Sequence, residues 1–121
     1  STFGGNPLAC AAGLAALDVM STPFDGTGET LPQRAARLGE VLQGRLRGID
    51  SPVVREVRGL GLMVGVELKV KVAPILQRLQ SLGVLALPAG MTVLRLLPPL
   101  VIDEADLERV AAAVETALAQ P

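Results

Sequence analysis

The feature that most constrains the fold is a run of alternating apolar residues that begins at Val53 and is interrupted at Gly59 and Gly61. Its two parts, Val53–Arg58 and Leu60–Leu68, repeat with a period of two, which is typical of strands with one buried face. We therefore expect two paired strands in the middle of the chain. The second strand places five apolar side chains on one face: Leu60, Leu62, Val64, Val66 and Leu68.

Helical patterns lie on both sides of these strands. Apolar residues at three- and four-residue steps predict helices over Leu31–Arg47, from Pro74 to a stop at Gly83, and from Asp103 onward. Short strands are expected at Val84–Leu87 and Thr92–Leu97. The resulting order, α-β-β-α-β-β-α, predicts an α+β fold in which helices cover a layer of antiparallel strands.

One more helix precedes this unit. Asn6 is a suitable N-cap and Pro7 a suitable first residue for a helix to about Met20, and its many alanines give a smooth surface that suits burial. The next segment, STPFDGTGET at 21–30, has one proline, two glycines and four hydroxyl residues. We expect a flexible link and a domain boundary there, which divides the chain into residues 1–22 and 23–121.

Charge and composition exclude several classes of protein. A net charge of −1, from 11 basic and 12 acidic residues, provides no basic surface for nucleic acid or an anionic membrane. The most apolar stretch, from Pro7 to Ala16, is shorter than the roughly 20 residues that span a bilayer. Cys10 is the single cysteine, so we expect a buried, reduced thiol, no metal site and a cytoplasmic protein.

Groups that commonly perform catalysis are scarce. The chain has no histidine, tyrosine or tryptophan, which excludes histidine triads, histidine zinc sites and tyrosine acids within it. Its two lysines, Lys69 and Lys71, stand at the polar end of an expected strand, where a solvated charge is the ordinary role. We do not expect self-contained chemistry.

Two segments could nevertheless bind an anion. Ser1 and Thr2 precede a glycine pair and a helix start, and free backbone amides at a helix N-terminus favour a phosphate, although a polar loop would look the same. In TVLRLLPPLVI, Arg95 stands among leucines and valine, so its guanidinium needs either an internal carboxylate or an anionic ligand. The glycines of VREVRGLGLMVGVEL lack nucleotide-loop spacing, so tight turns and close packing explain them better.

These three segments, STFGGNPLA, VRGLGLMVGVEL and RLLPPLVI, closely resemble those of the class-III pyridoxal-phosphate aminotransferases of the acetylornithine and ornithine group. The resemblance implies the small C-terminal domain of a fold-type-I homodimer with active sites at the subunit interface, preceded by one helix of the large domain. It implies that Thr2 contacts the cofactor phosphate of the neighbouring subunit, that Ser1 faces the substrate and that Arg95 binds the substrate α-carboxylate. Arg58 would be structural, and the Schiff-base lysine would lie upstream of this chain.

The resemblance leans toward an enzyme that moves the ω-amino group of acetylornithine, or of lysine attached to an amino-group carrier protein, to 2-oxoglutarate in arginine or lysine biosynthesis. The chain by itself is then expected to be inactive. A different class stays open: a stand-alone α+β module that holds a small anion with Arg95 and the Ser1–Thr2 loop, without catalysis. A strand-end lysine encoded upstream of Ser1 would distinguish the enzyme from the module.

Overall fold

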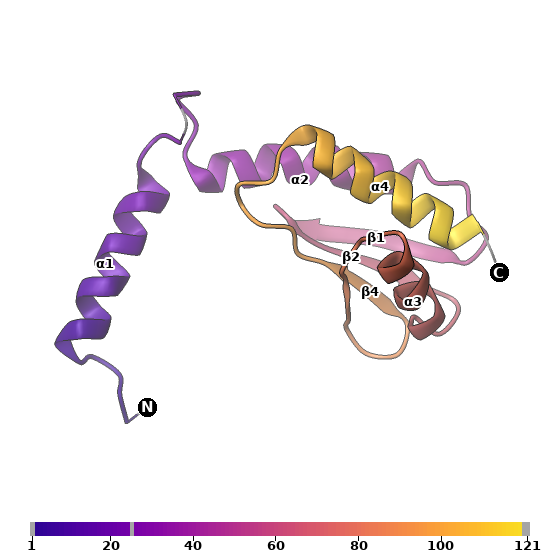
Figure 1. Cartoon of the computed structure of the whole chain (residues 1–121), viewed down its shortest axis with the longest axis horizontal. Coiled ribbons are helices and arrows are strands. Elements are labelled where there is room, and N and C mark those ends of the chain that lie inside the picture. The colour runs from indigo at the N-terminus through magenta and orange to yellow at the C-terminus, as the bar shows by residue number, and fades with distance from the viewer. Residues whose placement is uncertain (1, 25, 120–121) are drawn as a thin grey trace.

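The computed structural model describes residues 2–24 and 26–119. These residues form an α+β structure (Figure 1) with the elements α1 Pro7–Ser21, α2 Leu31–Arg47, β1 Val54–Leu60, β2 Met63–Leu68, α3 Ala73–Ser81, β3 Leu87–Pro88, β4 Val93–Leu96 and α4 Glu104–Ala119. The strands are antiparallel in the order β1-β2-β4-β3. The predicted fold class, antiparallel strands covered by helices, is confirmed.

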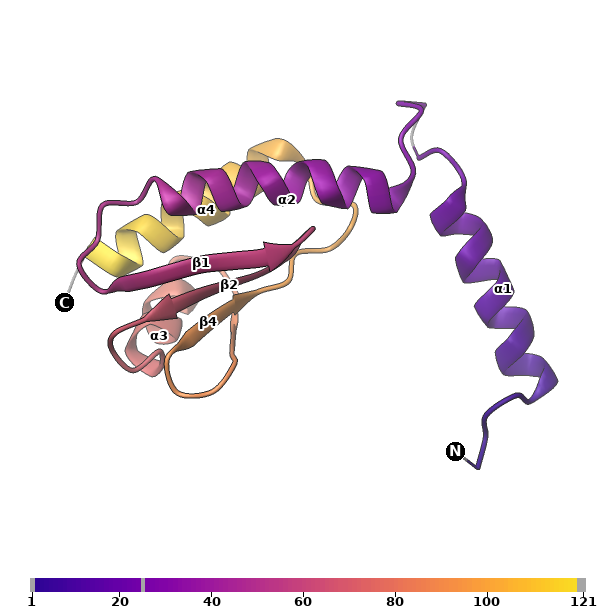
Figure 2. The same cartoon turned by 180° about the vertical axis from the view of Figure 1, so that it is seen from behind.

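One face of the sheet carries the core. On β2 and β4 every second side chain is buried, and α2, α3 and α4 add apolar stripes to the same cluster. The principal members of this core are Leu38, Leu42, Leu46, Val64, Val66, Leu68, Ile75, Leu79, Leu94, Leu96, Leu107, Ala111 and Val114. No helix among the described residues covers the opposite face, which Figure 2 shows toward the viewer. We call it the open face.

The turn between β1 and β2 explains Gly61 and the helix glycine Gly39 that faces it. Gly61 has φ +54°, and a Cβ added at Gly39 of α2 would lie 2.1 Å from the Gly61 carbonyl oxygen. The backbone of α2 therefore contacts the backbone of the β1–β2 turn, in agreement with the tight turn and close packing predicted for this segment. The turn also corrects one expectation: Leu60 ends β1 and is 88% exposed, because the alternation restarts after the turn at buried Leu62.

Side-chain caps fix three helix starts. Asn6 Oδ1 accepts from Ala9 N at 2.9 Å, as expected for α1. Thr30 opens α2 with a capping box, in which Thr30 N donates to Gln33 Oε1 at 2.9 Å. At α4, Asp103 Oδ1 accepts from Asp106 N at 2.7 Å. These short polar side chains satisfy amides that the helices leave unpaired.

The expected strand over Val84–Leu87 is wrong, because β3 contains only Leu87 and Pro88. The chain is still completing the end of α3 at this point: Gly83 has φ +81°, and Val84 N donates to Leu79 O at 2.8 Å. The backbone amide of Val84 therefore ends the helix and does not pair with a strand.

The segment between α1 and α2 also differs from the expected flexible link. Pro23 and Thr30 form an isolated antiparallel bridge, and Phe24 N donates to Glu29 O at 2.7 Å. The Arg34 guanidinium lies 5.8 Å from the Phe24 ring centroid, which attaches the segment to α2. Its described residues therefore form a closed loop on α2.

Helix α1 lies apart from the sheet in both views (Figures 1 and 2), and all its residues are exposed. The expectations of a buried helix and a buried Cys10 are wrong for this chain, because no other described element packs on the length of α1. None of the described helices combines the length and the apolar character needed to cross a membrane.

Candidate functional site

Three residues of the open face form a row across the sheet. Arg58 of β1 is paired with Gly65 of β2, and Gly65 is paired with Arg95 of β4. Directly opposed residues of antiparallel strands point to the same side. The two arginines therefore flank a residue that has no side chain.

Arg95 lies between two buried core residues, Leu94 and Leu96, and so projects to the open face. Its Nε atom is buried and has no hydrogen-bond partner among the residues that the structure describes. Within residues 2–24 and 26–119, no carboxylate comes within ion-pairing distance of this guanidinium. The described residues thus offer no internal carboxylate to Arg95, which leaves its guanidinium available to an anionic ligand.

A hollow of about 350 Å³ lies beside this guanidinium. Its lining combines the two arginines with small and apolar residues: Arg58, Gly59, Leu60, Met63, Val64, Gly65, Ala89, Val93 and Arg95. Cationic donors beside apolar walls suit a small carboxylate with an aliphatic body.

Arg58 participates in an ion-pair network on the same face. Its Nη1 donates to Glu56 Oε2 at 3.0 Å and to Glu67 Oε2 at 2.7 Å, and Glu67 also accepts from Arg55 at 3.0 Å. The hydrogen bond from Arg58 lowers the pKa of the Glu67 carboxyl below its ordinary value and raises the pKa of Arg58. These contacts join β1 to β2, which agrees with the structural role expected for Arg58.

At the other candidate segment, Thr2 is exposed in the turn before α1, and Ser1 lies outside the described residues. Asn6 shapes this turn: its Nδ2 donates to Phe3 O at 2.7 Å while its Oδ1 caps the helix. Gly5 adopts φ +77°, which glycine alone accommodates readily. An exposed hydroxyl before a capped helix start fits an anionic group such as a phosphate.

The two candidate segments are not brought together. The N-terminal end of α1, which Thr2 precedes, points away from the sheet that carries Arg95 (Figures 1 and 2). Within one copy of this chain, a single small ligand cannot contact both.

The lysines keep the ordinary role assigned to them. Lys69 and Lys71 are exposed, and Lys69 Nζ donates to Pro52 O at 2.8 Å.

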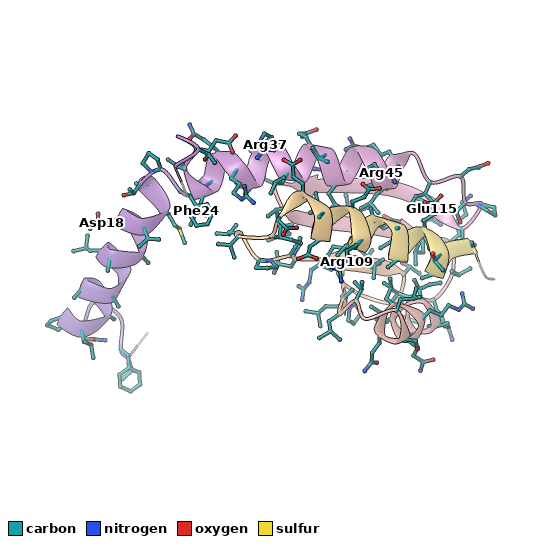
Figure 3. The ribbon with its side chains drawn as sticks, turned by 45° about the horizontal axis from the view of Figure 1, so that its top comes forward. Asp18, Phe24, Arg37, Arg45, Arg109 and Glu115 are labelled. Carbon is teal, nitrogen blue, oxygen red and sulfur yellow. The ribbon has the colours of Figure 1, made fainter. Side chains whose placement is uncertain are left out.

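Ion pairs on the far side of the core connect α2 to α4 and to the loop before α2, and no local pattern in the sequence predicts them. Arg37 contacts Glu29 at 2.9 Å and Glu104 at 2.6 Å, and Arg45 pairs with Glu108. Figure 3 shows Arg37 and Arg45 along α2 beside α4. They stand on the side of the fold opposite the open face, so they hold the helices together rather than face the hollow.

Sequence reasoning also missed Gly65 and Glu67 as neighbours of the site. The signal was available in principle, since counting residues back from the turn at Gly61 places Gly65 opposite Arg58. The pairing of Gly65 with Arg95 joins segments 30 residues apart and depends on the register of β2 with β4.

Comparison with known proteins places this site in context. A family model described as Aminotransferase class-III matches residues 1–118. The ornithine aminotransferase of Macrococcus caseolyticus (strain JCSC5402) is 48% identical over 108 residues, covering 89% of this chain and 26% of its own length. That of Bacillus subtilis (strain 168) is 46% identical, with 89% of this chain and 25% of its own covered. The chain thus spans about a quarter of the length of the curated relatives it matches.

Solved structures of aminotransferases also superpose on this chain. An ornithine delta-aminotransferase of Plasmodium falciparum superposes with a TM-score of 0.84 and 34% identity, covering 98% of this chain and 31% of that one. An acetylornithine aminotransferase from Elizabethkingia anophelis superposes with a TM-score of 0.83 and 33% identity, covering 100% of this chain and 32% of that one.

Proposed function

Because the chain belongs to the class-III aminotransferase family, we propose that it is the C-terminal part of a pyridoxal-phosphate-dependent aminotransferase. In this proposal residues 1–22 end the large cofactor-binding domain, and residues 23–121 form the small domain. The exposed, apolar α1 supports this division, because a helix with no polar face is stable in water only when another domain covers it.

The observation that carries the proposal is Arg95 beside the hollow on the open face, where its buried Nε has no partner among the described residues. Its planar fork matches a carboxylate in bidentate fashion, and a carboxylate is common to every amino-acid donor and oxo-acid acceptor. Arg95 accordingly binds the substrate α-carboxylate and orients the reacting end of the molecule away from the sheet.

The amino donor carries an ω-amino group, and the acceptor is 2-oxoglutarate. The names of the relatives, ornithine aminotransferase and acetylornithine aminotransferase, favour ornithine or acetylornithine as the donor. Lysine attached to an amino-group carrier protein is the third candidate, suggested by the sequence resemblance. Arginine or lysine biosynthesis would then be the setting, in the cytoplasm.

Pyridoxal phosphate, when bound, carries the amino group between the two substrates. In this chain the exposed Thr2 hydroxyl and the capped start of α1 fit its phosphate, with Ser1 facing the substrate. The lysine that bonds the cofactor and the groups that hold its ring belong to the part of the enzyme upstream of this chain.

A homodimer with active sites at the subunit interface accounts for the distance between the two segments. If Thr2 serves the site of the partner subunit while Arg95 serves the site of its own, the two need not meet within one copy. The distance between α1 and the sheet that carries Arg95 supports this arrangement (Figures 1 and 2).

The test is an activity assay on the complete protein loaded with pyridoxal phosphate. We expect transfer of an amino group to 2-oxoglutarate, with kcat/KM compared for ornithine, acetylornithine and carrier-linked lysine. Binding of 2-oxoglutarate without any turnover on the three donors would favour the non-catalytic anion-binding module instead.

A further inference from the structure

We propose that Arg58 is a second cation of the substrate site and holds the substrate carboxylate together with Arg95. This inference rests on the proposed function of Arg95 and extends it to a residue whose sequence context indicates only a structural role.

The geometry of the row places both guanidinium groups beside one hollow. Neighbouring strands are about 4.8 Å apart, so the Cα atoms of Arg58 and Arg95 are separated by roughly 10 Å across Gly65. A Cβ added at Gly65 would meet Val93 Cγ1 at 3.4 Å, an ordinary contact, so the backbone does not require glycine here. What glycine provides is open space between two long cationic side chains that line the same hollow.

The donor inventory of Arg58 leaves one edge free. Both of its carboxylate partners, Glu56 and Glu67, bind the same atom, Nη1. Its Nε and Nη2 atoms donate to no other residue in the part of the chain that the structure describes. The Nε–Nη2 edge is one of the two edges with which a guanidinium grips a carboxylate in bidentate fashion. The two glutamates therefore orient Arg58 without using that edge.

The charge balance of this face also leaves room for one anion. The network of Arg55, Arg58, Glu56 and Glu67 contains two positive and two negative groups and is neutral by itself. Arg95 adds to the same hollow one positive charge that no carboxylate of the described residues pairs with. A ligand with one carboxylate between the arginines would complete the balance and would accept hydrogen bonds from both.

The experiment compares Arg58→Gln with Arg55→Gln in the complete enzyme. Both changes remove a guanidinium bound to Glu67, but Arg55 does not line the hollow. The measurements are the melting temperature, kcat and KM for both substrates, and Ki for pentanoate, a monocarboxylate that cannot react. We expect Arg58→Gln to raise KM and Ki about three- to tenfold, as for loss of one partly exposed charge-assisted contact, with kcat within about twofold. Arg55→Gln should leave Ki within about twofold.

A double variant distinguishes the loss of a direct contact with the ligand from repulsion of the ligand by the negative charge that Arg58→Gln leaves unbalanced. Arg58→Gln with Glu56→Gln restores the charge balance of the face but not the lost donors, so Ki should stay raised. If Ki returns to the wild-type value in the double variant, or if Arg58→Gln alone leaves Ki unchanged, the proposed contact is refuted. Should Arg58→Gln not fold, Arg58→Lys replaces it, with an increase in Ki expected because the bidentate edge is lost.

The reference variant is Arg95→Lys, which reports on the proposed function itself. An increased Ki for Arg95→Lys with an unchanged Ki for Arg58→Gln overturns only the role of Arg58. An unchanged Ki for both overturns the carboxylate site as a whole.

Discussion

Replacement of Arg95 by lysine distinguishes ligand binding from packing more directly than any other single change. Lysine keeps one positive charge at the same place on β4 but loses the planar fork and all but one donor atom. If the guanidinium binds substrate, the loss appears in binding. If it is paired internally, the loss appears in stability.

The structure sets the expected magnitude. Among the described residues, Arg95 has a buried Nε without a partner and no carboxylate within reach, so lysine breaks no ion pair within this part of the chain. We expect the melting temperature of the complete enzyme to change little. A bidentate carboxylate contact reduced to a single bond should cost about 1.5–3 kcal/mol, which corresponds to a KM increase of roughly tenfold or more.

The assay measures KM for the amino donor and for the oxo-acid acceptor, together with thermal unfolding. Both substrates present a carboxylate to the same group in turn, so both KM values should rise together. The matched control is Arg109→Lys on α4, where the arginine forms a surface ion pair with Asp106 at 2.6 Å, and no change in KM is expected. Unchanged KM values combined with a markedly lower melting temperature for Arg95→Lys would refute the carboxylate role.

Three further predictions concern other parts of the chain. Thr2→Val in the complete enzyme should weaken pyridoxal phosphate binding, measured by equilibrium dialysis, by roughly tenfold, or about 1.4 kcal/mol. If Thr2 serves the partner's site, mixed dimers of this variant with a subunit that lacks the cofactor lysine should regain activity, and mixed dimers without activity would contradict that role. Gly39→Ala should destabilise the fold by about 1–3 kcal/mol in urea unfolding, because the new Cβ would lie 2.1 Å from the Gly61 carbonyl oxygen, whereas Gly44→Ala in the same helix, with open space around it, should be neutral or stabilising; equal effects would disprove the close contact. The bond from Arg45 holds the pKa of the Glu108 carboxyl below its ordinary value of 4.5, so this pair contributes stability at neutral pH that is lost as the pH falls through the lowered pKa; the melting temperature should drop on acidification below about pH 4.5, and by less in Arg45→Gln, and an identical pH profile for the two proteins would exclude this contribution.

Local patterns in the sequence were sufficient for the elements that a single period describes. The apolar stripes of α2 and α4 and the alternation of β2 and β4 depend only on residues near one another in the chain, and each appears in the structure within a few residues of its expected bounds. The caps at Asn6 and Asp103 are local as well, since a side chain binds an amide three residues away.

Local patterns gave wrong predictions of burial at two places, one beside a turn and one in a helix that no other described element covers. Leu60 continues the alternation of the following strand in the sequence, but the turn at Gly61 places it at the exposed end of β1. Helix α1 has the composition of a buried helix, yet burial depends on a partner that the described residues do not provide.

The candidate site separates most clearly what the sequence predicts from what only the tertiary structure decides. The sequence identified Arg95 by itself, because a guanidinium in an apolar strand needs a counter-charge wherever that strand lies. Only the fold shows that no described carboxylate supplies the charge and that Arg95 joins the row of Arg58 and Gly65. The reason is register: the pairing of β2 with β1 and β4 fixes which side chains meet, and a shift of one residue would turn Arg95 toward the core.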